Sequence, residues 1–265
     1  MKLALMLFLS LSGGFAQTAN ERGRQLVNEA LAALGGPKFL AIQDRVESGR
    51  AYSFYHEQLS GLSVATIYTR YRTPAQPAVP GQLLLDERQS FGKNEKYGST
   101  LFLQGQGYQI TFRGIRPISK QISDRYRDST LHSIFYILRE RLDEPGMIFE
   151  DRGTDVVENE HVRIVAITDS DNRTVTVYFN HLSKLPVRQV YYRRDPKTGD
   201  RNEEVSVFSK YRDVGDGVMW PFAIQRSRNG DRIYQMFAQT VEINKNPGGT
   251  LFSLPAGLPT LKPME

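Results

Sequence analysis

The sequence of 265 residues contains no cysteine, which excludes a disulfide framework and every thiolate-based metal or catalytic site. Its four histidines, His56, His132, His161 and His181, are far apart and show no metal-binding spacing such as HExxH. After the first sixteen residues, no stretch approaches the roughly 20 apolar residues that a membrane helix needs. We therefore expect a soluble mature chain whose fold depends on the packing of a hydrophobic core.

A strong excess of charge of one sign is also missing. Lysine and arginine number 34 against 29 aspartate and glutamate residues, which gives a net charge of +5. The basic residues are interspersed with acidic ones, as in Asp151-Arg152 and Asp200-Arg201, whereas nucleic-acid-binding surfaces cluster them. We expect no nucleic-acid partner, and weak attraction to anionic membranes or peptidoglycan stays open as an alternative.

The amino terminus has the pattern of an export signal. Met1-Lys2 provides a positive start, Leu3 to Leu11 is apolar except for Ser10, and Gly14-Phe15-Ala16 offers small residues for a signal peptidase. We predict a signal peptide over residues 1–16 that is cleaved after Ala16. An uncleaved amphipathic anchor or a buried first strand would be the alternatives.

The remainder, residues 17–265, is expected to form a single domain because no linker divides it. The Pro-rich stretch Thr73 to Gly81 lies between two strand-like segments and is predicted to be a long hairpin loop. Thr18 and Glu21 have capping-box spacing, so a helix should begin there and end at Gly35-Gly36. A short helical turn is expected over Pro37 to Ile42.

The rest of the pattern is mostly β. Apolar residues at helical spacing predict one further helix from Ser119 to Leu142, which ends at Glu144-Pro145-Gly146. Eleven or twelve strands with turn-like connections predict an α+β fold built on an antiparallel meander. The predicted strands cover residues 46–55, 64–71, 82–88, 100–104, 108–113, 147–152, 161–167, 174–179, 187–194, 203–211, 220–226 and 233–243.

One predicted strand carries the functional indication. Val175, Val177 and Phe179 form a continuous apolar face, and the alternate residues form a face that could meet water. Such a wall could hold a hydrophobic ligand. An ordinary filled core is the alternative reading.

Several segments together resemble the outer membrane lipoprotein-sorting (LolA/LolB-like) superfamily of bacterial periplasmic proteins. The amino-terminal helix that ends in Leu34-Gly35-Gly36, followed by Ile42 and Gly49, is similar to the start of that family. The other matching segments are Tyr178 to Asn180, Lys184 to Arg188, Asp195 to Gly199, Phe208 to Phe222, Val241 to Asn244 and Phe252 to Pro255.

The resemblance implies a strongly curved antiparallel sheet, an unclosed half-barrel, with helices covering its concave side over a cavity for acyl chains. In this picture the helix 119–142 is a lid, and the protein is a monomeric periplasmic carrier or chaperone for the acyl chains of a lipid or lipoprotein. A transient partner protein of the envelope would exchange the cargo. The residues predicted to line the cavity or lid are Val175, Val177, Phe179, Leu131, Phe135 and Leu138.

Catalytic motifs are not apparent, so we do not predict an enzyme. Gly61 to Ala65 lacks the second glycine of a nucleophile elbow, and Gly105-Gln106-Gly107 is a tight turn with no helix after it to bind a phosphate. Asp213 and Asp216 flank a glycine-rich turn and are expected to make turn hydrogen bonds. No cofactor is expected. A secreted hydrolase with an unrecognised site, or an interaction module of the envelope, remains the alternative function.

Overall fold

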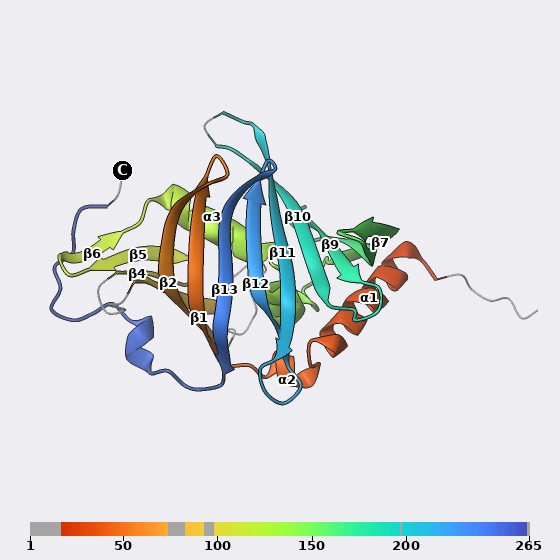
Figure 1. Ribbon diagram of the computed structural model, residues 1–265, viewed down its shortest axis with the longest axis horizontal. Coiled ribbons are helices and arrows are strands. Elements are labelled where there is room, and N and C mark those ends of the chain that lie inside the picture. Colours follow the sequence, from red (N-terminus) through yellow and green to blue (C-terminus); the bar gives the residue numbers. More distant parts are fainter. Residues whose placement is uncertain (1–16, 74–82, 93–97, 197, 264–265) are drawn as a thin grey trace, which may run out of the picture.

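The computed structural model describes residues 17–73, 83–92, 98–196 and 198–263, and it contains one open sheet of thirteen antiparallel strands (Figure 1). The strand order is β6-β5-β4-β3-β2-β1-β13-β12-β11-β10-β9-β8-β7. Two meanders, β1 to β6 and β7 to β13, are joined by the pairing of β1 with β13. The predicted α+β class and antiparallel meander are confirmed.

The strand bounds follow the sequence pattern to within six residues, and the largest differences are the earlier start of β2 and the later end of β7. They are β1 (Asp44–Tyr55), β2 (Gln58–Tyr71), β3 (Leu85–Phe91), β4 (Ser99–Leu103), β5 (Gln106–Thr111), β6 (Gly114–Pro117), β7 (Ile148–Val157), β8 (Glu160–Thr168), β9 (Thr174–Asn180), β10 (Pro186–Arg194), β11 (Arg201–Asp213), β12 (Met219–Arg228) and β13 (Asp231–Ile243).

The strand that sequence reasoning missed is β6. Its four residues begin with a glycine and end with a proline, both of which weaken the usual strand signal. The predicted hairpin loop falls mostly on residues 74–81, which lie outside the described residues. The structure shows that β2 ends at Tyr71 and that β3 begins at Leu85.

The first helix, α1 (Ala19–Ala33), begins as predicted with a capping box between Thr18 and Glu21. It lies across β7 and is followed by the short helix α2 (Pro37–Leu40). Gly23 is where α1 meets the sheet most closely, since a Cβ atom there would lie 2.2 Å from the carbonyl oxygen of Phe149 in β7. A glycine inside this helix is therefore explained by packing.

The predicted single helix over Ser119 to Leu142 is wrong, because the chain breaks it into pieces. Helix α3 (Lys120–Leu131) ends at His132, and Ser133 is extended, with φ −68° and ψ 124°. The chain then forms α4 (Ile134–Tyr136) and a π-helical turn, η1 (Ile137–Arg141). At the break, the Ile134 backbone N–H donates to Gln189 Oε1 of β10 at 2.9 Å. A contact with the sheet thus replaces a helical hydrogen bond.

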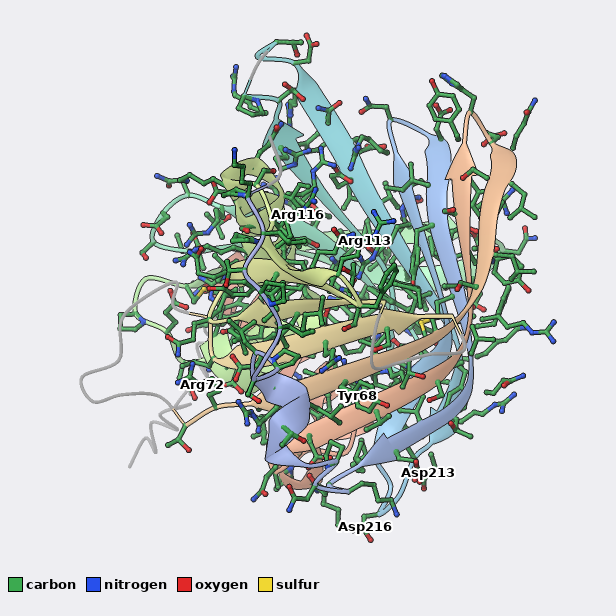
Figure 2. The ribbon with its side chains drawn as sticks, turned by 90° about the vertical axis from the view of Figure 1, so that its left-hand side faces the viewer. Tyr68, Arg72, Arg113, Arg116, Asp213 and Asp216 are labelled. Atoms are coloured by element: carbon green, nitrogen blue, oxygen red, sulfur yellow. The ribbon has the colours of Figure 1, made fainter. Side chains whose placement is uncertain are left out.

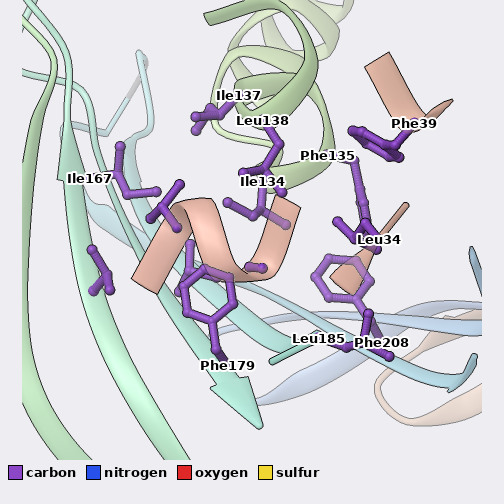
Figure 3. Close-up of a cluster of buried hydrophobic side chains, with 14 of the residues drawn as sticks. Leu34, Phe39, Ile134, Phe135, Ile137, Leu138, Ile167, Phe179, Leu185 and Phe208 are labelled. Atoms are coloured by element: carbon purple, nitrogen blue, oxygen red, sulfur yellow. The ribbon is translucent and has the colours of Figure 1, made fainter. Parts of the chain in front are cut away.

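The two faces of the sheet are covered differently. We call the inner face the one that bears Val175, Val177 and Phe179, against which α1, α2 and residues 134–138 pack to form the main core (Figure 3). We call the opposite side the outer face. The core also receives side chains from β7, β8, β10, β11, β12 and β13.

The carboxyl-terminal segment packs against the outer face of β3 and reaches β6. It includes the 3-10 turn η2 (Gly249–Phe252), where the Leu251 carbonyl accepts a hydrogen bond from Arg88 Nη1 at 3.3 Å. Farther along, Thr260 forms a bridge with Ile115 of β6. Figure 2 shows this segment running past the edge strands. Among the described residues, no helix is long and apolar enough to cross a membrane.

Candidate ligand-binding region

The structure brings five of the six residues predicted to bind a ligand into one apolar region. Val175, Val177 and Phe179 lie on the inner face of β9. Phe135 and Leu138, from the segment that covers this face, pack in the same cluster. Leu131 belongs to a second cluster, with Leu83, Leu85 and Tyr136. The side chains of the apolar region fill it, and Val177 and Leu138 are completely buried. Their role in ligand binding stays a prediction.

Aromatic rings form the end of this region nearest α2. Phe135 lies edge-on to Phe208, with ring centroids 5.0 Å apart, and 4.8 Å from the ring of Trp220. Trp220 in turn stacks on Phe39 of α2 at 6.4 Å. Figure 3 shows Phe135, Phe208, Phe39 and Leu34 gathered in this part of the core. These packed rings make this end of the region apolar.

Residues 132–144, which we call the strap, cover the apolar region and are fastened by polar contacts. On the side of β3, the Tyr136 hydroxyl accepts a hydrogen bond from the Leu84 N–H at 2.7 Å. Near α2, Arg139 Nε donates to the Ile42 carbonyl at 3.1 Å. Because hydrogen bonds reach the strap from segments that are far apart in the sequence, its position is specified by directional contacts as well as by burial.

The carboxyl-terminal end of the strap is held by an ionic cluster. Arg141 donates to Asp169 Oδ2 at 2.7 Å and to Glu144 Oε2 at 2.6 Å, and Arg173 Nε reaches the same Asp169 oxygen at 2.8 Å. Burial alone would raise the pKa of Asp169, but the hydrogen bonds from Arg141 and Arg173 outweigh it and hold that pKa below its usual value. This carboxylate is therefore charged at neutral pH.

On β1, β2 and β3 the inner face bears buried charged and polar side chains. We call this part the charged region. Arg45 is buried over the ring of Trp220, 3.9 Å from its centroid, and donates to Glu47 at 2.7 Å and to the Tyr71 hydroxyl at 2.9 Å. On β3, burial raises the pKa of Glu87, although Gln89 donates a hydrogen bond to it at 2.6 Å. These charged groups therefore have hydrogen-bond partners.

A partly open pocket of about 530 Å³ lies where the strap, the end of β2 and the carboxyl-terminal segment meet. Arg70 and Arg72 line it and share the buried Asp86, at 2.7 Å and 3.9 Å. Arg139 of the strap stacks over the Tyr71 ring at 4.0 Å. Burial raises the pKa of the neighbouring Glu140, against the effect of Arg139. Sequence reasoning missed this pocket because its parts come from three distant segments.

The residues considered for catalysis do not form a catalytic arrangement. Asp213 Oδ1 accepts hydrogen bonds from the N–H groups of Gly215 at 2.8 Å and Gly217 at 3.3 Å, which confirms the prediction for Asp213. Asp216 of the same turn (Figure 2) contributes its backbone carbonyl, which accepts from Lys38 Nζ at 2.9 Å. Ser63 of the Gly61 to Ala65 stretch lies within β2, in regular pairing with Ala51. In the part of the chain that the structure describes, no three His, Asp or Glu side chains gather as metal ligands.

Comparison with known proteins places the fold. No family model matches the sequence, and no curated protein matches it. Among solved structures, a DUF1329 family protein from Desulfovibrio piger superposes with a TM-score of 0.60 at 13% identity, covering 89% of this chain and 98% of that one. A LolA superfamily protein from Nitrosomonas europaea gives 0.51 at 10% identity, covering 90% and 98%.

A third solved structure is described as an outer membrane lipoprotein-sorting protein domain and comes from Vibrio parahaemolyticus. It superposes with a TM-score of 0.55 at 10% identity, covering 88% of this chain and 97% of that one. The chain has the LolA-like fold. The resemblance inferred from the residues is thereby confirmed at the level of structure, over most of the length of these three proteins.

Proposed function

We propose that the protein is a periplasmic carrier or chaperone that shields the acyl chains of a lipid or lipoprotein in the apolar region beneath the strap. The observation that supports this most is the composition of the space between the strap and β8 to β12, where hydrocarbon and aromatic side chains from both sides face one another. The LolA-like fold is consistent with the proposal. Under this proposal, the strap moves aside to admit the cargo.

The contacts of the strap support a curved sheet around it. The Tyr136 hydroxyl accepts a hydrogen bond from the N–H of Leu84, next to β3, and the Ile134 N–H donates one to Gln189 of β10. These strands are six positions apart in the sheet, so a flat sheet would separate them by about 29 Å. A three-residue segment cannot span that distance. We infer a half-barrel whose concave side is the inner face, with the helices inside it.

The path of the chain supports the same geometry. The segment that contains α3 and the strap connects β6 with β7, and these two strands are the opposite edges of the sheet. Because residues 134–138 pack against the inner face, the connection crosses that face. Under the proposal this segment is the lid, and it forms hydrogen bonds with Leu84 beside β3 and with Gln189 of β10, which belong to different halves of the sheet.

Binding energy would come from burial of the chain. Each CH₂ group transferred from water is worth about 0.8 kcal/mol, so half of a long acyl chain gives usable affinity without specific polar contacts. Part of this energy is offset, because the chain must displace side chains that already fill the region. We therefore expect affinity to rise with chain length and to vanish for short chains.

A chain-length series tests the proposal. The mature protein is titrated with a fluorescent fatty acid, which is then competed with unlabelled fatty acids of increasing length. The proposal predicts that the concentration of unlabelled fatty acid needed to displace half of the fluorescent one falls steadily as the chain lengthens. A flat series, or no binding at micromolar protein, would contradict it and favour an interaction module. Lipid extraction and mass spectrometry of the purified protein would separately reveal a cargo acquired in the cell.

The proposed location depends on residues 1–16, which lie outside the described residues. If they form a signal peptide, protein recovered from the periplasm begins at or near Gln17. Mass measurement of the intact protein checks this directly. A soluble cytoplasmic pool that retains Met1 would contradict the proposed export.

A further inference from the structure

The outer face of the sheet carries an apolar and cationic surface over the strands that the carboxyl-terminal segment leaves free. Its apolar part is the β1–β2 hairpin, in which Leu59, Leu62 and Val64 are 57%, 57% and 54% exposed. Their register partners on β1 are Phe54, Tyr52 and Arg50. The alternate residues Ala51 and Ala65 are buried in a cluster with Met236 on the inner side. The three aliphatic side chains therefore point outward.

Aromatic rings with cations above them continue this surface across the neighbouring strands. Arg232 lies over the Phe54 ring at 4.5 Å, and Lys210 lies over Phe237 at 5.1 Å. Farther along, Arg201 lies over Tyr192 at 3.7 Å. The carboxylate of Glu203 beside Tyr192 accepts a hydrogen bond from the tyrosine hydroxyl at 3.0 Å. Each ring thus pairs an apolar body with a positive charge.

A shallow pocket of about 410 Å³ on β9 to β11 belongs to the same surface. Its polar side chains include Arg194 and Arg201, together with Thr174 and Thr176, and none of its described lining residues is an aspartate or glutamate. The pocket therefore has the charge and the hydrogen-bond donors to hold a phosphate group.

We propose that this outer surface docks the protein onto an anionic lipid bilayer. The hairpins β1–β2, β10–β11 and β12–β13 lie at one end of the sheet (Figure 1), and Leu59, Arg201 and Arg232 are within two residues of the start of the second strand of each hairpin. Leucine, valine and aromatic side chains enter the interfacial layer of a membrane, while arginine and lysine pair with lipid phosphates. A soluble polyanion would use the cations and leave Leu59, Leu62 and Val64 in water.

The experiment measures binding of the mature protein to vesicles by flotation. Vesicles of phosphatidylcholine alone are compared with vesicles that contain phosphatidylglycerol, at low and high salt. We expect binding to the anionic vesicles that weakens with salt. A variant with Leu59→Ser, Leu62→Ser and Val64→Ser should bind at least about tenfold more weakly. Arg194→Gln with Arg201→Gln should lose about fivefold for each charge.

The matched control is Leu182→Ser, which changes a leucine that is 87% exposed in the β9–β10 turn, at the opposite end of the strands. It should bind vesicles as the wild type does, and circular dichroism confirms that all variants are folded. Equal binding to both kinds of vesicle would overturn the proposal. So would a triple serine variant that binds anionic vesicles as tightly as the wild type, since a soluble anion site would then account for the attraction. Complete competition by inorganic phosphate would likewise overturn it.

Discussion

The two parts of the inner face differ in the kind of side chains that fill them. Over β8 to β12, apolar side chains of the sheet meet those of α1 and the strap, and the core is hydrocarbon and aromatic. Over β1 to β3, Arg45 and Glu47 are buried as a pair, and Glu87 lies among polar neighbours. Trp220 marks the boundary, since one of its neighbours is Phe135 and another is Arg45.

Under the proposed function, this difference predicts where a hydrophobic cargo would be accommodated. An acyl chain in the apolar region would exchange one set of hydrocarbon contacts for another. In the charged region it would have to separate paired groups whose desolvation has already been compensated by hydrogen bonds. We therefore expect the two regions to respond differently to substitution, and the following predictions are ordered from the largest effect to the smallest.

The largest effect is expected from breaking the buried pair. Glu47→Leu leaves the Arg45 guanidinium without its carboxylate, and should lower the free energy of unfolding by about 3–5 kcal/mol. Urea denaturation measures the change. The double variant Arg45→Met with Glu47→Leu should recover much of the loss, because neither partner is then left as a buried charge without the other. A double variant that is less stable than Glu47→Leu would mean that the pair is not an isolated unit.

In the apolar region, Leu138→Ala should lower the free energy of unfolding by about 2–5 kcal/mol, because the side chain is completely buried. Thermal denaturation provides the measurement, and the exposed Leu182→Ala serves as the control, with a change within about 0.5 kcal/mol. Leu138→Asp should be more severe. An unchanged melting temperature for the aspartate variant would show that the strap is not packed.

The contact of α1 with β7 is tested by Gly23→Ala. In a helix interior this change ordinarily stabilises by about 1 kcal/mol, but here the new Cβ would meet the Phe149 carbonyl oxygen at 2.2 Å. We expect a net loss of about 1–3 kcal/mol as the helix moves away from the sheet. A variant that melts above the wild type would show that α1 covers the apolar region loosely.

The smallest expected effect is the dependence of stability on pH through Asp169. The pKa of Asp169 is lower in the folded protein than in the unfolded chain, so its contribution to stability is present above the unfolded value of about 3.9 and is lost as pH falls through the folded value. Asp169→Asn should be less stable than the wild type at neutral pH, and the gap should narrow below about pH 4. Urea denaturation of both proteins at a series of pH values measures this gap. A gap that is independent of pH would assign the loss to hydrogen bonding alone.

Much of the fold follows from local sequence patterns. Period-two alternation located twelve of the thirteen strands, and the capping box of Thr18 and Glu21 located α1, because these signals are encoded within a few residues. The break at Ser133 was not predictable in this way. It depends on Gln189, more than fifty residues away, which accepts the Ile134 N–H.

The candidate region shows the same limit. Alternation on β9 identified Val175, Val177 and Phe179 as one buried face. It could not show that Leu131, which ends α3 before the break, packs in a different cluster with Leu83 and Leu85. The arginine-lined pocket and the buried Arg45–Glu47 pair likewise require long-range pairing of strands. Charged residues in a strand ordinarily predict a solvated face.

The most direct test of the proposed carrier function is to locate a bound acyl chain. A long-chain fatty acid with a photoreactive diazirine at mid-chain is bound to the mature protein and irradiated, and the adducts are mapped by peptide mass spectrometry. The account predicts adducts on residues 175–179 of β9 and on residues 134–138 of the strap, which an excess of unlabelled long-chain fatty acid removes. Adducts confined to the outer face, or to the charged region of β1 to β3, would contradict it.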